Sequence, residues 1–394
     1  MKSGTWSLLL KMCMRHIQSH PFRGTSLRLV THVLLACWSG IPAIAGGQSA
    51  APRGLRPLEP VRIQETDTLF LSRPAQMVLG PRGHVYLTEG REARVLDIGP
   101  DGRIERVFGR KGRGPGEFES PAAMTMSGDT VLAVYDHATK RVTFIHIPTW
   151  TLQRVSPLVT QWPPVIKFAA GDLLVSTWDF ETKTSIAKAV EGTGALDERQ
   201  GVIPALGAQT QMLITGAFWN STFAPIGDEI FAMYEVSNSL YRWKRGARDA
   251  REIVLPAVRR RGVPPDLFES LLRDPAKATP AMLYDRSAPV AIAQVSDDIL
   301  AIVTMDVKVD GDMWSGVHHV TLFDRRRDRL CVDLAAPASR MKVALMKDPL
   351  PIVALRGDTL ALLEQAESAA GDPVQLLRRY RIEPSQCEWS ALTR

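Results

Sequence analysis

The side chains that could carry chemistry in this 394-residue chain are a few histidines, acidic residues and cysteines. His84, His137 and His146 are far apart in the sequence, and they could share a metal ion only if the fold brought all three to one axis. His318 and His319 are adjacent, and neighbouring residues of a strand point to opposite faces. The spacing therefore predicts no metal site among the histidines.

Within the acidic stretch from Asp306 to Gly316, the residues Asp310-Gly311-Asp312 resemble a calcium loop. The stretch reads D-V-K-V-D-G-D-M-W-S-G, with carboxylates at Asp306, Asp310 and Asp312, but it lacks the glutamate that ends an EF-hand loop. We interpret it as the polar tip of a hairpin. The sequence contains no G-x-S-x-G elbow, and no serine, histidine and acid form a triad by their spacing. It therefore identifies no catalytic, cofactor-binding or metal-binding residue.

The cysteines point to a disulfide. Cys13 and Cys37 lie near the start of the chain, so Cys331 and Cys387 are the only pair in its main body. In an oxidising compartment an isolated pair is more often a disulfide than a metal site. We predict a bridge between Cys331 and Cys387, with two free buried cysteines as the alternative.

Residues 1–45 are typical of an export leader. They contain five basic residues and no acidic one, an apolar stretch from Leu29 to Trp38, and a small-x-small sequence at Ala43-Ile44-Ala45. The sequence L-L-A-C ending at Cys37 also resembles a bacterial lipobox, so lipidation of Cys37 is an alternative to simple secretion. The apolar stretch is shorter than the roughly 18 residues of a transmembrane helix. The true start codon is open, since Met12 or Met14 could begin a shorter leader.

The leader also explains the basic composition. The whole chain has 48 basic and 42 acidic residues, which gives a net charge of +6. Without the leader the balance is 43 to 42, close to neutral. A nearly neutral chain gives no electrostatic reason to bind nucleic acid.

The elements around these residues follow a repeat. Six turns of similar composition each precede a strongly apolar strand, and their second residues are 46, 43, 56, 70 and 60 residues apart. The turns are Arg82-Gly83, Gly128-Asp129, Gly171-Asp172, Gly227-Asp228, Asp297-Asp298 and Gly357-Asp358. The strands after them are apolar at nearly every position, so both of their faces must be covered. Few helical patterns are available to cover them, and strands of neighbouring blades would do so in a β-propeller.

The segment from Val107 to Pro121 joins the first two repeats. It reads V-F-G-R-K-G-R-G-P-G-E-F-E-S-P, and its glycines and proline predict a long shaped turn in which Phe118 is the apolar anchor. The pieces G-x-V-Y-L-x-E, R-V and G-x-G-P-G-E-F-x-x-P between about residues 76 and 145 resemble the NHL repeat of six-bladed β-propellers. The pairs Glu89 with Arg94 and Asp136 with Arg141 belong to this pattern, and we expect them to fix turns within a blade.

We therefore predict an all-β, six-bladed β-propeller of four-stranded antiparallel blades over residues 61–394. Residues 46–60 are rich in Gly, Pro, Ala and Arg and are expected to form a disordered tether. The segment from Val61 to Leu71 has no repeat of its own and could complete the last blade. A capped apolar pattern from Asp266 to Arg273 predicts a short helical insertion between blades 4 and 5.

Two functions fit this sequence. The first is an extracytoplasmic binding or scaffolding propeller, secreted, periplasmic or lipid-anchored, and monomeric. It would present its loops and central channel to a peptide, glycan or protein. The second is a metal-dependent hydrolase or lyase, because the resemblance to six-bladed propellers also implies lactonases and amidating lyases with Ca²⁺ or Zn²⁺ in the channel. No ligand set of those enzymes can be matched here, so the fold is better supported than any activity.

Overall fold

The computed structural model describes most of the chain after the leader. The described residues are 54–160, 164–177, 179, 182–203, 221–234, 239–256, 273, 286–310, 313–336, 339–342, 352–368 and 371–392. The chain separates into two units, Met1–Gln48 and Ser49–Arg394. The predicted leader and Cys37 therefore lie outside the described residues.

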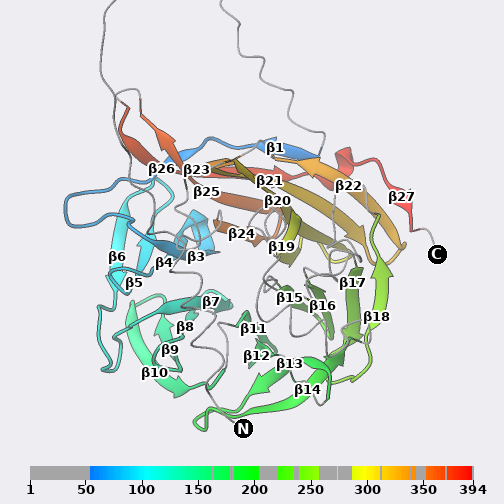
Figure 1. Ribbon diagram of the computed structural model, residues 1–394, viewed down its shortest axis with the longest axis horizontal. Coiled ribbons are helices and arrows are strands. Elements are labelled where there is room, and N and C mark those ends of the chain that lie inside the picture. The colour runs from blue at the N-terminus through cyan, green and yellow to red at the C-terminus, as the bar shows by residue number, and fades with distance from the viewer. Residues whose placement is uncertain are drawn as a thin grey trace, which may run out of the picture. The chain divides into compact units, whose positions relative to one another are not determined.

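Six antiparallel sheets form the second unit, and they are arranged around a central axis as the blades of a propeller (Figure 1). In each of the first four blades the strands pair in chain order, starting from the strand nearest the axis. Blade 1 contains β3 (Pro74–Leu79), β4 (Val85–Glu89), β5 (Arg94–Ile98) and β6 (Ile104–Phe108). Blade 2 contains β7 (Pro121–Ser127), β8 (Val131–Asp136), β9 (Arg141–His146) and β10 (Thr151–Pro157). Blade 3 contains β11 (Ile166–Ala169), β12 (Asp172–Ser176), β13 (Thr184–Ala189) and β14 (Leu196–Val202), and blade 4 contains β15 (Ser221–Ile226), β16 (Glu229–Tyr234), β17 (Ser239–Lys244) and β18 (Arg251–Val254).

The last two blades include strands from elsewhere in the chain. Blade 5 contains β19 (Arg286–Gln294), β20 (Ile299–Asp310), β21 (Met313–Asp324) and β22 (Arg329–Ala335), with β23 (Ser339–Lys342) on β21 and β27 (Ser390–Ala391) on the edge of β22. Blade 6 contains β24 (Ile352–Arg356), β25 (Thr359–Glu367) and β26 (Pro373–Ile382), and its outer edge is completed by β1 (Leu55–Pro57) and β2 (Val61–Arg62). The inner strands contact one another in sequence, and β24 contacts β3, which closes the ring.

The N-terminal closure differs in detail from the sequence prediction. The segment after residue 60 does pair with the last blade, through β2 and a hydrogen bond from the amide of Ile63 to the carbonyl of Gln375 (2.9 Å), while β1 adds a second pairing at Leu55–Pro57. Leu55 is only 2% exposed and packs between blades 5 and 6. The propeller therefore includes residues that the composition had assigned to the tether, because one apolar side chain in that segment is buried.

The six predicted turns are the turns between the first and second strands of the six blades. Four of them contain a glycine at positive φ that would meet no neighbouring atom if it carried a side chain, at Gly128, Gly171, Gly227 and Gly357. At these positions glycine therefore serves the backbone conformation and not close packing. The prediction of a six-bladed β-propeller with four-stranded antiparallel blades is confirmed.

The core is divided among the blade interfaces. The apolar residues of each second strand alternate between the two neighbouring blades, as shown by Leu300 and Ile302 towards blade 4 and Ala301 and Val303 towards blade 6. This alternation explains why these strands are apolar at every position.

Helix is sparse in the described part of the chain. It consists of the short 3-10 helices η1 (Pro81–Gly83) and η3 (Pro384–Gln386) and the single residue Arg273. The rest of the helix expected at residues 266–273 lies outside the described residues. Among the residues that the structure describes, no helix has the length and apolar character needed to cross a membrane.

Candidate functional site

The acidic residue that ends the second strand of a blade organises the backbone around it. Asp136 accepts hydrogen bonds from the amides of Glu119 (2.6 Å) and Ser120 (3.0 Å) before its strand and from those of Ala138 and Thr139 (both 3.0 Å) after it. Its side chain is fully buried, so these four donors compensate the charge. Asp136 therefore fixes the turn within its blade, as the sequence predicts.

Glu89 has the same role in blade 1, where it accepts from the amides of Arg73 (2.6 Å) and Glu92 (2.7 Å). Arg94 and Arg141 lie opposite Glu89 and Asp136 in the strand register. The side chain of Arg141 donates to the carbonyls of Gly114 (2.8 Å) and Glu117 (2.6 Å). In blade 2, Asp136 thus accepts from amides of the preceding loop, and Arg141 donates to carbonyls of the same loop.

The glycine-rich loop is therefore a rigid structural element. Phe118 is fully buried and its ring lies edge-on to Phe108 at 6.2 Å. Gly109 has φ +84°, and a Cβ there would lie 2.6 Å from the Phe118 ring, so only glycine fits. Gly112 donates to the carbonyl of Phe118 (2.9 Å), which closes the loop on itself.

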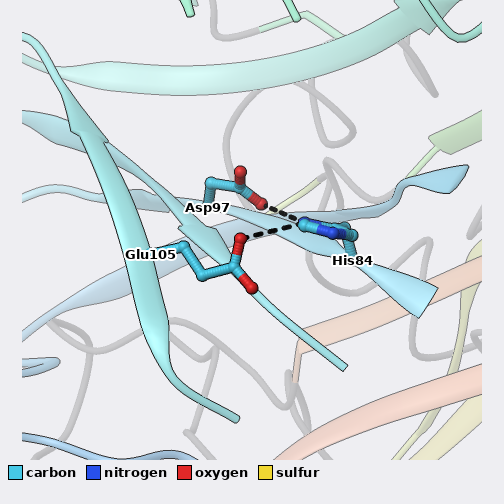
Figure 2. Close-up of side chains that lie close together, drawn as sticks. All are labelled: His84, Asp97 and Glu105. Atoms are coloured by element: carbon cyan, nitrogen blue, oxygen red, sulfur yellow. Dashed lines mark hydrogen bonds and ion pairs between the residues drawn. The ribbon is translucent and has the colours of Figure 1, made fainter. Parts of the chain in front are cut away.

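His84, Asp97 and Glu105 form a cluster that could be considered for a metal ion (Figure 2). His84 Nδ1 lies 2.8 Å from Asp97 Oδ1 and 4.0 Å from Glu105 Oε2. The three residues come from the start of β4, from β5 and from β6, so they lie in the outer part of blade 1 and not on the inner strand. They are the only such group of three or more potential ligands in the described part of the chain.

The guanidinium of Arg106 already occupies part of this cluster and opposes the binding of a divalent cation. Asp97 is fully buried and its Oδ2 already accepts from Arg106 at 2.7 Å (Nε) and 2.6 Å (NH2). A cation held by this carboxylate would lie beside the guanidinium. Arg106 also stacks on the ring of Trp150 at 4.6 Å and donates to the carbonyl of Ile147 (3.0 Å), both in blade 2. The cluster therefore links blade 1 to blade 2.

The other histidines lie apart. His137 Nδ1 is 3.2 Å from Lys140 Nζ, and burial, followed by the charge of Lys140, lowers the pKa of His137. Lys140 also donates to the carbonyl of Thr160 (2.8 Å), and burial lowers its pKa. His146 Nδ1 is 2.8 Å from the hydroxyl of Thr149. His84, His137 and His146 thus have separate local partners.

His318 and His319 point to opposite faces of blade 5, in agreement with the alternation argument. His319 Nε2 lies 3.4 Å from Asp306 Oδ2. His318 is on the same face of its strand as Val320 and Leu322, which pack towards blade 6. Its side chain is fully buried. Burial lowers the pKa of His318 to about 3, so the ring is neutral at physiological pH. Of the predicted hairpin tip, Asp310 ends β20, and Asp312 lies outside the described residues.

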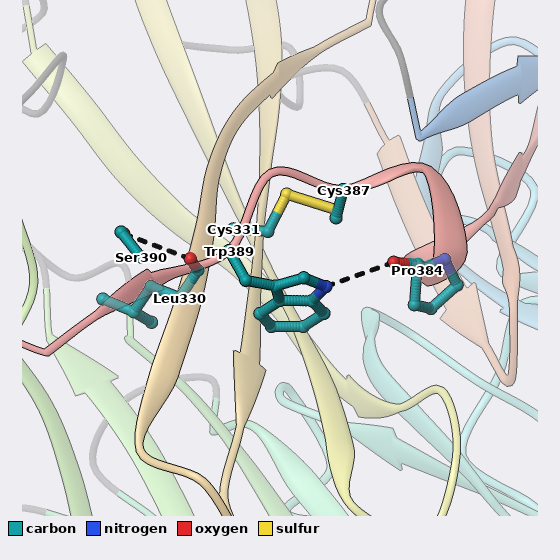
Figure 3. Close-up of a disulfide and its surroundings, with 6 residues drawn as sticks. All are labelled: Leu330, Cys331, Pro384, Cys387, Trp389 and Ser390. Carbon is teal, nitrogen blue, oxygen red and sulfur yellow. Dashed lines mark hydrogen bonds between the residues drawn. A yellow bond between two sulfur atoms is a disulfide. The ribbon is translucent and has the colours of Figure 1, made fainter.

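Cys331 and Cys387 are bonded in the structure (Figure 3), with their Cα atoms 5.8 Å apart. Cys331 is on β22 and Cys387 follows η3, where the chain has left blade 6 and crosses to blade 5. The bond fastens the crossing segment, which continues into β27 on the edge of blade 5.

A groove between blades 2 and 3 is the candidate binding site. Its volume is about 300 Å³. Most of its apolar lining belongs to the core cluster between these blades, namely Val142, Phe144, Leu158, Phe168, Leu173 and Ala189. Its charged lining consists of Arg154, Asp172, Lys188, Glu191, Asp197 and Glu198. An apolar floor with a few charged groups at the rim is the usual composition of a small ligand site.

Three ion pairs line this groove, and one of them, between Arg154 and Glu191, joins blade 2 to blade 3. Arg154 lies 2.6 Å from Glu191, and its guanidinium is stacked 3.6 Å from the centre of the Phe144 ring. Lys188 Nζ lies between Asp172 (3.3 Å) and Glu198 (3.1 Å). Hydrogen bonds to Glu198 and then to Asp172 raise the pKa of Lys188. The sequence gives no sign of this site, because its residues are spread over two blades and carry no motif.

No protein-family model and no curated protein matches this chain. Solved structures do resemble it. A member of the DUF4221 family from Bacteroides vulgatus has a TM-score of 0.53 at 8% identity, over 84% of this chain and 99% of that one. A candidate exported protein from Bacteroides fragilis has a TM-score of 0.49 at 10% identity, over 84% and 96% of the two chains. Virginiamycin B lyase from Staphylococcus aureus has a TM-score of 0.43 at 13% identity, over 82% and 99%. At such identities the likeness concerns the fold alone.

Proposed function

We propose that this chain is an extracytoplasmic binding or scaffolding propeller of the NHL-like type. The observation that carries the proposal is the groove between blades 2 and 3, which offers an apolar floor and opposite charges at its rim. The surrounding blades supply a rigid frame, because the turn and loop backbones are held by buried carboxylates such as Asp136. The partner would be a peptide, a glycan or a protein, and the propeller itself would act as a monomer.

The location follows from the sequence. The basic and apolar stretch in residues 1–45 supports export, with either cleavage near Ala45 or lipidation at Cys37. A bridge between Cys331 and Cys387 would suit an oxidising compartment. Mass spectrometry of the mature N-terminus distinguishes the two forms. An intact Met1 on protein recovered from the cytoplasm would contradict both.

Peptide and glycan arrays probed with the mature protein test the binding role. We expect saturable binding to a restricted set of peptides or glycans, in the absence of any turnover. The alternative function, a metal-dependent hydrolase or lyase, gains no support from the His84–Asp97–Glu105 cluster, since Arg106 holds Asp97. A stoichiometric, tightly bound Ca²⁺ or Zn²⁺ in the purified protein, together with an array that shows no binding, would favour that alternative.

A further inference from the structure

Arg154 occupies the groove as a side chain of the protein itself. Its guanidinium covers the face of Phe144, which is only 3% exposed, and it pairs with the carboxylate of Glu191. A cation on an aromatic face beside a carboxylate is a favourable arrangement. This part of the groove thus holds a guanidinium group between an aromatic ring and a carboxylate.

The contacts of Arg154 are of the kind that an incoming group can replace. The side chains of Arg154 and Glu191 are 40% and 72% exposed, and exposed ion pairs contribute little to stability. Arg154 lies on β10, the outer strand of blade 2, which pairs only with β9 and has five exposed residues from Thr151 to Val155. Its side chain can therefore turn out towards solvent without disturbing the fold.

Without Arg154, the net charge of the groove rim is negative and favours the binding of a cation. With Arg154 turned away, the rim contains one ammonium group, Lys188, and four carboxylates: Asp172, Glu191, Asp197 and Glu198. The apolar floor is suited to an aliphatic stem or a neighbouring apolar side chain. The shape and the charge of the groove are thus complementary to a long cationic side chain within a chain segment.

We propose that the groove between blades 2 and 3 binds an extended segment of a partner protein through an arginine or lysine side chain, which displaces Arg154 from Phe144 and Glu191. This inference rests on the proposed binding function and specifies its partner. Next to the pair of Arg154 with Glu191, the two blades are joined by hydrogen bonds from the amide of Gly192 to the hydroxyl of Ser156 (3.1 Å) and from the amide of Val159 to the carbonyl of Gly194 (3.1 Å).

The probes are acetyl-Leu-Arg-Leu-amide and the same peptide with citrulline, which has nearly the same shape and no charge. Binding to the mature protein is measured by calorimetry at low salt. We expect the arginine peptide to bind at least about tenfold more tightly than the citrulline peptide. Arg154→Ala should increase the affinity about fivefold by removing the competing cation, and Glu191→Gln should decrease it by a similar factor.

The matched control is Arg251→Ala on β18, the equivalent outer strand of blade 4. Arg251 is also exposed (66%), and its contact is an ion pair to Asp328 at 4.0 Å. This variant should bind the peptide as the wild type does. Equal affinity for the arginine and citrulline peptides would overturn the inference, as would unchanged binding in Glu191→Gln. If acetyl-arginine-amide alone bound as tightly as the peptide, a small guanidinium compound and not a chain segment would be the ligand, which also overturns it.

The arrays separate this inference from the broader proposal. If an array partner binds equally to the wild type and to Glu191→Gln, the groove is not its site, yet the propeller remains a binding protein. If neither the arrays nor the peptide give binding, the broader proposal fails as well.

Discussion

We expect the buried imidazole of His318 to make the fold sensitive to mild acid. Neither of its ring nitrogens has a hydrogen-bond partner among the described residues. Burial lowers the pKa of His318 from 6.5 to about 3, so the folded protein keeps the ring neutral at pH values where the unfolded chain binds a proton. Stability from this source is therefore complete above pH 6.5 and is lost as the pH falls towards 3.

The size of the effect follows from proton linkage. For these two pKa values, the neutral ring of His318 lowers the free energy of unfolding by about 2 kcal/mol between pH 7 and pH 5. His318→Met fills a similar volume and cannot bind the proton. The variant should lose about 2 kcal/mol less than the wild type over this interval. Blade 6 packs against the face of blade 5 that contains His318, and there Arg378 donates to the carboxylate of Glu364 (2.6 Å). This pair is unchanged in His318→Met, so it does not contribute to the difference between the variant and the wild type.

The measurement is urea-induced unfolding of the two proteins at pH 7 and at pH 5, with the disulfide kept intact. Met305→Leu is the control, because Met305 is fully buried opposite His318 in the register of β20 and β21. It should lower stability by the same amount at both pH values, since it changes packing and no charge. If His318→Met and the wild type lost equal stability between pH 7 and pH 5, the reasoning would be refuted.

Three other outcomes are expected. Asp136→Asn should lower the free energy of unfolding by about 3 kcal/mol in urea, because an amide cannot accept from all four backbone donors; a change near zero would contradict the role of this carboxylate. Thiol titration of the unfolded, unreduced mature protein should detect neither Cys331 nor Cys387, and reduction should cost about 4 kcal/mol at most; two titrating thiols would disprove the bridge. Added Ca²⁺ or Zn²⁺ should leave the melting temperature unchanged, because Arg106 already holds Asp97; tight binding that Asp97→Asn abolishes would show a metal site.

The sequence predicted the parts of the fold that depend on local backbone requirements. The Gly-Asp turns could be recognised because each needs a particular backbone conformation at a fixed place before an apolar strand. The buried turn acids Glu89 and Asp136 could be predicted for the same reason, since their partners are within about twenty residues of them. The turns and the turn acids recur from blade to blade, and this recurrence allowed them to be recognised in the sequence.

The features that the sequence did not predict depend on contacts between strands. His84 and Asp97 meet because Val85 pairs with Ile98, so the residue before one strand reaches the last residues of the next. A strand register predicted for the hairpin of β4 and β5 would have placed His84 next to Asp97. The groove and the β27 crossing offer no such signal, because each depends on how one blade packs against another.

Both ends of the described chain are strands on neighbouring blades: β1 and β2 on blade 6, and β27 on blade 5. The sheet of blade 6 therefore joins segments separated by more than 300 residues, as the pairing of Leu55 with Ile382 shows. During synthesis, the earliest strands have no partner until β26 has left the ribosome. Ring closure is thus a late, non-local event in folding.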